Sequence, residues 1–408
     1  MGILLTQRSG MIIGNIAKLL GFLMDAIFEA LSSIGIENIG LCIILFTIII
    51  YTLMLPLQIN QQKFSRISAV MNPEIQKIQK KYQGKNDQAS MVKMQEETKL
   101  VYEKYGSSPT GGCLGSLIQL PFLFALWPVV QNIPAYVTGV KETYMPLVEQ
   151  IMATDGYQKI MEAFGTLKTI NISPERYDYS KANTMVDILY KFQESTWDAL
   201  ADKLPELSDL VRSTEANLSH MNKFLGINIA ESPSSLFASA VGTFSIGMMI
   251  VAIAIPVLAG VTQYLSVRLS QSKLQKQNQQ NDNVMVQQMN TMMKVMPLMS
   301  VVMCFTMPSG LGIYWITSAV VRTIQSVIIN HQLDKKPIDE LVKENMEKAA
   351  KKRASKKEVE AKTVNAMAHK STKTVTTSNN VESYKKNAKP GSLASKANMV
   401  SDYNKNNK

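Results

Sequence analysis

Long stretches without a single charged residue decide what this chain can fold into. GLCIILFTIIIYTLMLPLQ (40–58) and GGCLGSLIQLPFLFALWPVVQNI (111–133) carry no formal charge, and about 20 apolar residues let a helix cross a hydrocarbon core of ~30 Å. The stretches 236–267 and 292–329 are also strongly apolar. The 408 residues are therefore not an even blend of soluble domains, and the pattern predicts an all-α integral membrane protein.

The breaks within these runs predict five transmembrane helices. Residues 292–329 are too long for one crossing, and Pro308, Ser309 and Gly310 place turn residues near their middle. We therefore expect a tight hairpin of two spans there. The predicted spans are residues 39–58, 111–133, 241–267, 292–307 and 311–331.

The polar segments between the spans differ in character. Residues 59–110 are charged and predict a helical hairpin, in which Asn72 followed by Pro73 indicates a helix boundary. Residues 134–240 carry aromatic and apolar residues at intervals, which predicts amphipathic helices. The rest are a Gln- and Asn-rich loop, 268–291, and a basic tail, 332–408, whose low apolar content predicts that it is mostly disordered.

The N-terminal segment, residues 1–38, contains one amphipathic stretch, IIGNIAKLLGFLMDAIFEALSS (12–33). Its polar residues recur at helical spacing and form one stripe: Asn15, Lys18, Asp25, Glu29 and Ser32. Such a helix is suited to lie in the membrane interface, and a sixth span is the alternative. Charges within the apolar region argue against a cleavable signal, so we expect the N-terminus to be retained.

The distribution of charge predicts the orientation. Residues 59–110, 268–291 and the tail are rich in Lys and Arg, whereas residues 134–235 hold nine basic and fourteen acidic residues. Because cytoplasmic segments carry the excess of positive charge, we expect the N-terminus and the large loop outside and the C-terminus in the cytoplasm. The predicted location is the cytoplasmic membrane.

Familiar catalytic motifs are absent from the sequence. The three histidines, His220, His331 and His369, share no local metal-ligand spacing, and the three cysteines lie in or beside apolar runs. The chain has no Walker A, HExxH or GxSxG motif. We expect no enzyme activity of a familiar type, no metal, no cofactor and no disulfide framework.

GIYWITSAVVRTIQSVIIN (312–330) is nearly apolar, yet it carries Arg322 near its middle. On a helix, Trp315, Ser318, Ala319 and Arg322 fall on one face. Arginine near the bilayer centre costs about 2.5 to 3.5 kcal/mol on insertion scales, so it usually faces protein or water. Two interpretations stay open: a guanidinium that reaches the cytoplasmic interface, or a wet groove inside the membrane.

Three stretches resemble the YidC membrane protein insertases, in the five-span form of Gram-positive bacteria. They are LPLQINQQKFSRISAVMNPEIQKIQKKY (55–82), SPTGGCLGSLIQLPFLFALW (108–127) and MPSGLGIYWITSAVVRTIQ (307–325). The resemblance covers residues 12–132 and about 246–332. The combination of GGC with IQLP, the PSG hairpin and the charged hairpin after LPL is specific.

The resemblance implies five helices around a positively charged hydrophilic groove that is open to cytoplasm and lipid. In that family the groove arginine lies five residues before the proline of the LPL-like motif, and here that position is Tyr51, before Pro56. At about 1.5 Å of rise per residue, Tyr51 and Arg322 lie at similar depths. We hypothesise that Arg322 supplies the relocated cation, with the Tyr51 hydroxyl as its partner.

Further groove residues follow from the same resemblance. Gln119 matches the polar residue of the IQ-P motif, and Tyr314 and Trp315 match an aromatic pair of the last span. With Arg322, Tyr51 and Ser318 they would line a site that holds water and attracts acidic substrate residues. An interhelical hydrogen bond for Gln119 and plain packing for the aromatic pair are the alternatives. Two interpretations stay open for a group of methionines in the fourth span, which could fill apolar space or contact varied clients. They are Met292, Met293, Met296, Met299, Met303 and Met307.

The leading prediction is a membrane protein insertase and assembly chaperone that needs no nucleotide, with nascent membrane proteins and membrane lipids as partners. The basic tail and the charged hairpin could contact the ribosome, and the Sec translocon is a further expected partner; a merely solvated tail is the alternative. The competing function is an anion-recognising transporter or channel built on Arg322. An insertase has no small-molecule substrate.

Overall fold

The computed structural model describes most of the chain. It covers residues 7, 10–85, 87–108, 113–168, 170, 172, 174–175, 177–270, 284–351, 354–355 and 399–400, with side chains at all of these except 113–120, 123, 284–290 and 292–294. Most of the predicted loop 268–291 and of the predicted tail lies outside the described residues, as do the side chains of Gln119, Met292 and Met293. The chain forms two compact units, Met1–Lys343 and Glu344–Lys408, and the helices below belong to the first.

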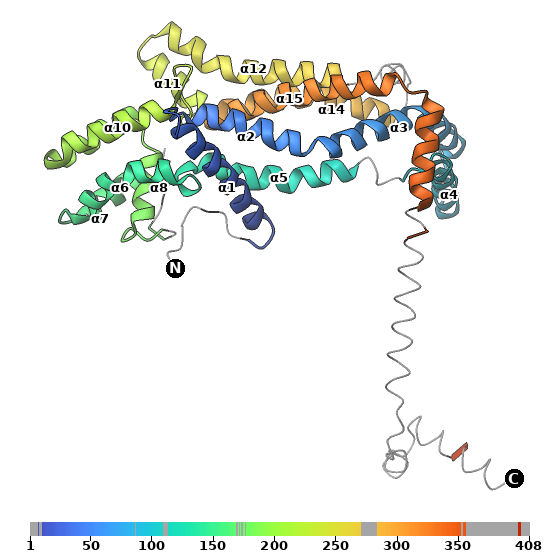
Figure 1. The fold of residues 1–408 in the computed structure, drawn as a ribbon, viewed down its shortest axis with the longest axis horizontal. Helices are drawn as coiled ribbons and strands as arrows, with labels where there is room; N and C mark the ends of the chain where they lie inside the picture. The colour runs from blue at the N-terminus through green and yellow to red at the C-terminus, as the bar shows by residue number, and fades with distance from the viewer. Residues whose placement is uncertain are drawn as a thin grey trace. The chain divides into compact units, whose positions relative to one another are not determined.

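The described residues are mostly helical (Figure 1). The longer helices are α1 (Ile13–Ser32), α2 (Ile39–Leu53), α3 (Leu55–Tyr82), α4 (Gln88–Lys104), α5 (Cys113–Gln131), α12 (Ile246–Ser270), α14 (Val284–Thr306) and α15 (Ser309–Asp334). The α6–α11 segment, residues 133–242, holds η1 (Ile133–Ala135), α6 (Thr138–Ala153), α7 (Tyr157–Gly165), α8 (Ala182–Tyr190), α9 (Glu194–Lys203), η2 (Pro205–Leu207), α10 (Ser208–Asn222), β1 (Lys223–Phe224), β2 (Ile227–Asn228) and α11 (Pro233–Gly242). The two strands pair antiparallel, Lys223 with Asn228 and Phe224 with Ile227.

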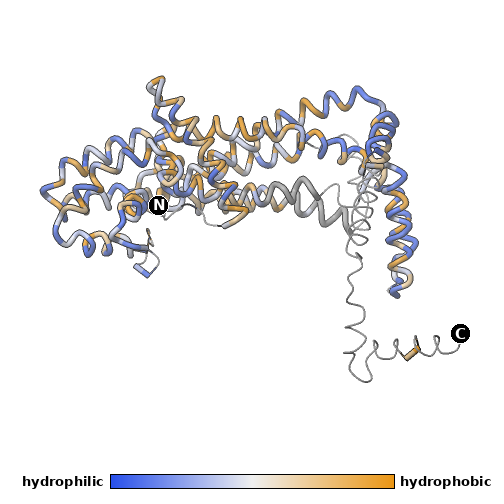
Figure 2. The backbone as a smooth tube through the Cα atoms, turned by 60° about the horizontal axis from the view of Figure 1, so that its bottom comes forward, coloured by the Kyte–Doolittle hydropathy of each residue, from blue (hydrophilic) through white to orange (hydrophobic). Residues whose placement is uncertain are grey.

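Two of the described helices, α12 and α15, are long and apolar enough to cross a membrane, and the number rises to three if α2 and α3 count as one bent span. Residues Val295–Thr306 of α14 form a shorter apolar stretch. Figure 2 shows apolar residues along the long helices and hydrophilic residues at the α3–α4 end. One side of α12 exposes large apolar side chains, as a helix that faces lipid does: Ile250, Val257, Leu258, Val261 and Leu265.

Small residues let α12 approach its neighbours closely. A Cβ added at Gly312 of α15 would collide with the side chain of Ile255, and one added at Gly260 of α12 would collide with Val301 of α14. Helix pairs in lipid gain stability from such close van der Waals packing, because hydrocarbon provides little hydrophobic drive for association. Glycine at these positions therefore sets the spacing of α12, α14 and α15.

The helix boundary predicted at Asn72 and Pro73 is wrong, because α3 continues through Pro73. A proline inside a helix costs about 3 kcal/mol. Ile67, Met71 and Ile75 lie on either side of this proline in the sequence and are buried against α4. Burial of such side chains contributes roughly 1.5 to 3 kcal/mol each, so tertiary packing outweighs the local penalty.

Ion pairs align α3 and α4 as an antiparallel pair. Lys104 Nζ lies 2.8 Å from Glu74 Oε1, and Lys81 Nζ lies 2.6 Å from Glu97 Oε1. The hydrogen bond from Lys104 is the main cause that lowers the pKa of Glu74. These pairs are solvent-exposed and fix register more than they add stability.

The α6–α11 segment is attached firmly to the long helices. Asp25 of α1 accepts hydrogen bonds from Thr138 N at 2.7 Å and Thr138 Oγ1 at 3.1 Å, so it caps the start of α6. At the start of α15, Ser309 N donates to Glu231 O at 2.8 Å and Gly310 N to Ile229 O at 2.9 Å. Asp25, a member of the predicted polar stripe of α1, therefore links α1 to the start of α6.

Leu147 of α6 is fully buried in the core that the α6–α11 segment shares with α1 and α2. We expect Leu147→Ala to lower the free energy of unfolding by about 2 to 5 kcal/mol, because it leaves a cavity. Thermal unfolding in detergent, followed by intrinsic tryptophan fluorescence, to which the buried Trp197 of α9 contributes, measures the effect. Leu167→Ala, at a position that is 42% exposed, is the control, and equal midpoints for the two variants would contradict the packing described.

Candidate functional site

Arg322 lies half-buried in α15 and contacts two other helices, α2 and α12. Its Nε donates to Ser318 O at 3.2 Å within α15, and its Nη2 donates to Gln263 Oε1 of α12 at 3.3 Å. Its guanidinium carbon lies 5.7 Å from the centroid of the Tyr51 ring of α2. Gln263 and Tyr51 are 4% and 3% exposed. The arginine therefore turns toward protein, as the cost of a charge in hydrocarbon requires.

Tyr51, at the position where the YidC resemblance places an arginine, contacts α15 through three groups. Its ring lies against Arg322, its hydroxyl is 3.3 Å from that of Tyr314, and its carbonyl accepts from Gln325 Nε2 at 3.2 Å. We expected the Tyr51 hydroxyl to be the partner of Arg322. The structure instead places the face of the ring there, which makes the contact a cation–π interaction.

The other predicted site residues divide into two groups. Ser318 and Tyr314 are buried in the same part of α15, and Ser318 Oγ donates to Trp315 O at 2.9 Å. Trp315 is half-buried, and it is its backbone carbonyl, not its indole, that accepts this hydrogen bond. Gln119 belongs to α5, but its side chain lies outside the described residues.

Polar pairs continue along α15 toward its C-terminal end, and sequence reasoning missed them. Gln62 Nε2 of α3 donates to Ser326 Oγ at 3.1 Å. One helical turn further on, Arg66 Nη2 donates to Asn330 O at 2.8 Å and to Asp334 Oδ1 at 2.6 Å. Residues on α3 and α15 that are four apart meet in order, because the two helices run in the same direction.

These side chains form a continuous set with α12, which adds Gln263 and the carbonyl of Ser270, an acceptor for Asn330 Nδ2 at 3.1 Å. We name the set the polar track. It consists of Tyr51 of α2, Gln62 and Arg66 of α3, Tyr314, Ser318, Arg322, Gln325, Ser326, Asn330 and Asp334 of α15, and Gln263 and Ser270 of α12. We include Gln58 as well, because it lies one turn before Gln62 on the same face of α3.

The polar track has unused hydrogen-bonding capacity. Within the described part of the chain, Gln58 Oε1, Gln325 Oε1 and Arg66 Nε are buried without a hydrogen-bond partner. A buried polar atom without a partner costs roughly 1 to 3 kcal/mol. With two guanidinium groups and one carboxylate, the track can attract an anionic group, and its free oxygens can accept from water or from a bound N–H.

A periodicity of four was the available signal for the missed residues. Gln58, Gln62 and Arg66 recur at that spacing after the first apolar run, which places them on one helix face. Sequence reasoning placed Gln58 at the end of the first span and Gln62 and Arg66 in the charged hairpin, because nothing local indicates that this face meets α15.

The Arg66 side chain, 5% exposed, ties α3 to the last turns of α15. We expect Arg66→Met to speed amide hydrogen exchange in residues 326–334 about fivefold. The substitution removes the charge-assisted hydrogen bonds, which stabilise the contact. It also removes the cost of burying a cation, and this offsets part of the lost stability. Exchange measured by mass spectrometry tests this, with Lys77→Met, at an exposed position of α3, as the control. Unchanged exchange in the Arg66 variant would mean that the ion pair does not hold α15.

Comparison with known proteins supports the resemblance seen in the sequence. A family model described as 60Kd inner membrane protein matches residues 30–336. Membrane protein insertase MisCA of Bacillus subtilis (strain 168) is 37% identical over 137 residues, which is 31% of this chain and 52% of the relative. Membrane protein insertase YidC 2 of Bacillus anthracis is 40% identical over 96 residues, 24% of this chain and 37% of the relative.

A third relative, membrane protein insertase YidC of Oceanobacillus iheyensis, is 31% identical over 147 residues, 34% of this chain and 57% of the relative. The chain thus spans about half or less of the length of the first curated relatives it matches. The family model, in contrast, runs from before α2 to just beyond α15 and includes every residue of the polar track. This multi-pass membrane protein belongs to the 60Kd inner membrane protein family, the family of the YidC insertases.

Proposed function

We propose that the chain is a membrane protein insertase, in which the polar track is the wet wall of an intramembrane groove. The observation that carries the proposal is the position of Arg322, half-buried in an apolar helix and held by Gln263 and Tyr51 from two other helices. In the proposed arrangement five spans surround the groove, with the N-terminus outside and the C-terminus in the cytoplasm. The relatives named above are insertases, and nothing observed favours an anion transporter.

The track would lower the barrier for a polar or acidic flank of a client segment. Arg322 attracts the flank, because the effective dielectric constant in a narrow groove between apolar helices is lower than in bulk water, which strengthens the interaction between charges. The oxygens of Gln58 and Gln325, which lack partners among the described residues, accept hydrogen bonds from water or from client N–H groups. The client's apolar segment then moves into lipid, and its burial supplies the free energy without nucleotide or metal.

Arg322 would serve as the groove cation that the family carries at the position of Tyr51. The ring of Tyr51 lies against the guanidinium, so the cation reaches the same place from α15 instead of α2. Gln119 and Trp315 would complete the groove lining.

The remaining partners belong to the same proposal. Nascent membrane proteins are the clients, membrane lipids receive them, and the charged α3–α4 hairpin and basic tail would meet the ribosome on the cytoplasmic side. The Sec translocon would be a neighbour in the membrane.

Arg322→Ala tests the proposal directly. We expect insertion of a single-span substrate with an acidic translocated tail into proteoliposomes to fall about 10- to 150-fold. This is the factor expected when a charge-assisted interaction worth roughly 1.5 to 3 kcal/mol is lost. Adding Tyr51→Arg to Arg322→Ala should restore insertion, since the cation returns to the same place from α2.

Arg268→Ala is the matched control, because Arg268 is exposed near the end of α12 and bonds Tyr264 at 3.0 Å. It should insert the substrate at the wild-type rate. Full insertion by Arg322→Ala would instead make Arg322 an interfacial anchor and remove the basis of the proposal.

The ring of Tyr51, rather than its hydroxyl, should matter for holding Arg322. Tyr51→Phe keeps the ring and should stay within about twofold of wild-type insertion. Tyr51→Leu removes the cation–π contact, worth roughly 0.5 to 2 kcal/mol, and should lose about fivefold. The same proteoliposome assay measures both, and equal rates would show that the ring does not position the arginine.

A further inference from the structure

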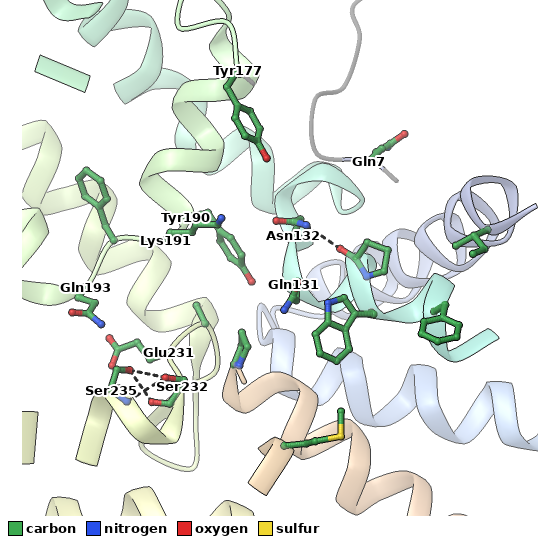
Figure 3. A pocket seen from close by; sticks show the side chains of 18 residues that line it. Gln7, Gln131, Asn132, Tyr177, Tyr190, Lys191, Gln193, Glu231, Ser232 and Ser235 are labelled. Carbon is green, nitrogen blue, oxygen red and sulfur yellow. Dashed lines mark hydrogen bonds between the residues drawn. The ribbon is translucent and has the colours of Figure 1, made fainter. Parts of the chain in front are cut away.

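A second site lies at the other end of α15 from Arg66. A cavity of about 1040 Å³ opens there between the last turns of α5, the turn before α15 and the α6–α11 segment (Figure 3). Pockets for small ligands in proteins are commonly about 300 to 1,000 Å³. Its lining includes Pro308, one residue before α15, so the cavity is distinct from the polar track.

The lining has an apolar side and a polar side. Phe124, Trp127 and Met303 come from the apolar helices α5 and α14, and Phe124 is 59% exposed. The opposite wall is polar, and Figure 3 shows Gln193 and Glu231 together there, beside Ser232 and Ser235. A site with one apolar and one polar side, where helices leave an apolar layer, matches an amphiphile.

Two opposite charges face this cavity. Lys191 follows the end of α8, and its Nζ donates to Ile170 O at 3.2 Å. Glu231 precedes α11, and its Oε1 accepts from Asn228 Nδ2 at 3.2 Å. In the described part of the chain neither forms a salt bridge. Both are half-buried. Asp187 acts electrostatically on Lys191 without forming a salt bridge with it, so a ligand could supply each of the two groups with a direct counter-charge.

Burial acts on both groups in the same sense, toward the neutral form. Burial lowers the pKa of Lys191, and the nearby Asp187 carboxylate opposes this shift. Burial raises the pKa of Glu231, and the hydrogen bond from Asn228 partly offsets that rise. A ligand that brings an anion to Lys191 and a cation to Glu231 would favour the charged form of both.

We propose that this cavity binds the phosphodiester headgroup of a glycerophospholipid, with the phosphate at Lys191 and the ammonium of phosphatidylethanolamine at Glu231. The acyl chains leave past Phe124 and Met303 into the bilayer. Such a lipid site requires that α5 and α14 lie in a bilayer. Binding of the lipid does not depend on the proposed insertase activity. A client peptide would supply apolar and polar groups as well, but it has no fixed pair of opposite charges.

Native mass spectrometry of the full-length protein in detergent tests the proposal by titration with phosphatidylethanolamine. We expect Lys191→Met to weaken binding at least about fivefold, while Lys191→Arg keeps it. Lys181→Met, at an exposed position beside Asp178 in the same segment, should bind like wild type. Glu231→Gln should weaken binding of phosphatidylethanolamine but not of phosphatidylglycerol, which lacks the ammonium.

Other results would overturn the proposal. Equal binding by the Lys191→Met and Lys181→Met variants would place the lipid elsewhere. Binding of soluble glycerophosphoethanolamine as tight as that of the lipid would assign the cavity to a free phosphodiester. Displacement of the lipid by an acidic peptide would assign it to a client. Thermal unfolding of the lipid-free variants, followed by circular dichroism, shows that each variant is folded. Insertion activity, measured separately, does not bear on the outcome.

Discussion

A guanidinium in the middle of an apolar helix has to be solvated by the protein itself, and the arrangement of α2, α12 and α15 follows from that need. Arg322 receives an amide oxygen from Gln263 and an aromatic face from Tyr51. Neither partner alone would neutralise the charge, since one is a single dipole and the other a quadrupole. The site therefore leaves the cation electrostatically active, which distinguishes it from a structural ion pair such as Arg66 with Asp334.

The rest of the polar track is a consequence of helix direction. The contacts of α15 with α2 and α3, and with α12, advance along both partners in the same order. Residues four apart on one helix consequently meet residues four apart on the next. The bend of 57° between α2 and α3 lets the chain follow α15 from Tyr314 to Asp334 while the apolar surface of α2 remains with the other long helices.

Much of this could be predicted from the sequence, because it depends on local patterns. The uncharged runs indicated apolar helices, and helical spacing placed Ser318 and Arg322 on one face. The three motifs near Pro56, Pro121 and Pro308 indicated the family that the comparisons then confirmed. Such signals need only a few neighbouring residues.

The errors all concern contacts between distant parts of the chain. Pro73 is tolerated because α4 packs against α3, and no local rule contains that information. The Tyr51 hydroxyl lies beside that of Tyr314, 263 residues away, and the ring of Tyr51 meets Arg322 instead. The role of Arg66 was missed for the same reason, since its partners lie 264 and 268 residues further on.

The attachments of α15 have a mechanical meaning. Hydrogen bonds from Ser309 and Gly310 hold its first turn to the α6–α11 segment, and Arg66 holds its last turn to α3. A helix attached at both ends resists sliding and tilting, and Arg322 lies between the two attachments. Its charge is thus held at a fixed position, and in the proposed insertion the client segment, not the arginine, would have to move.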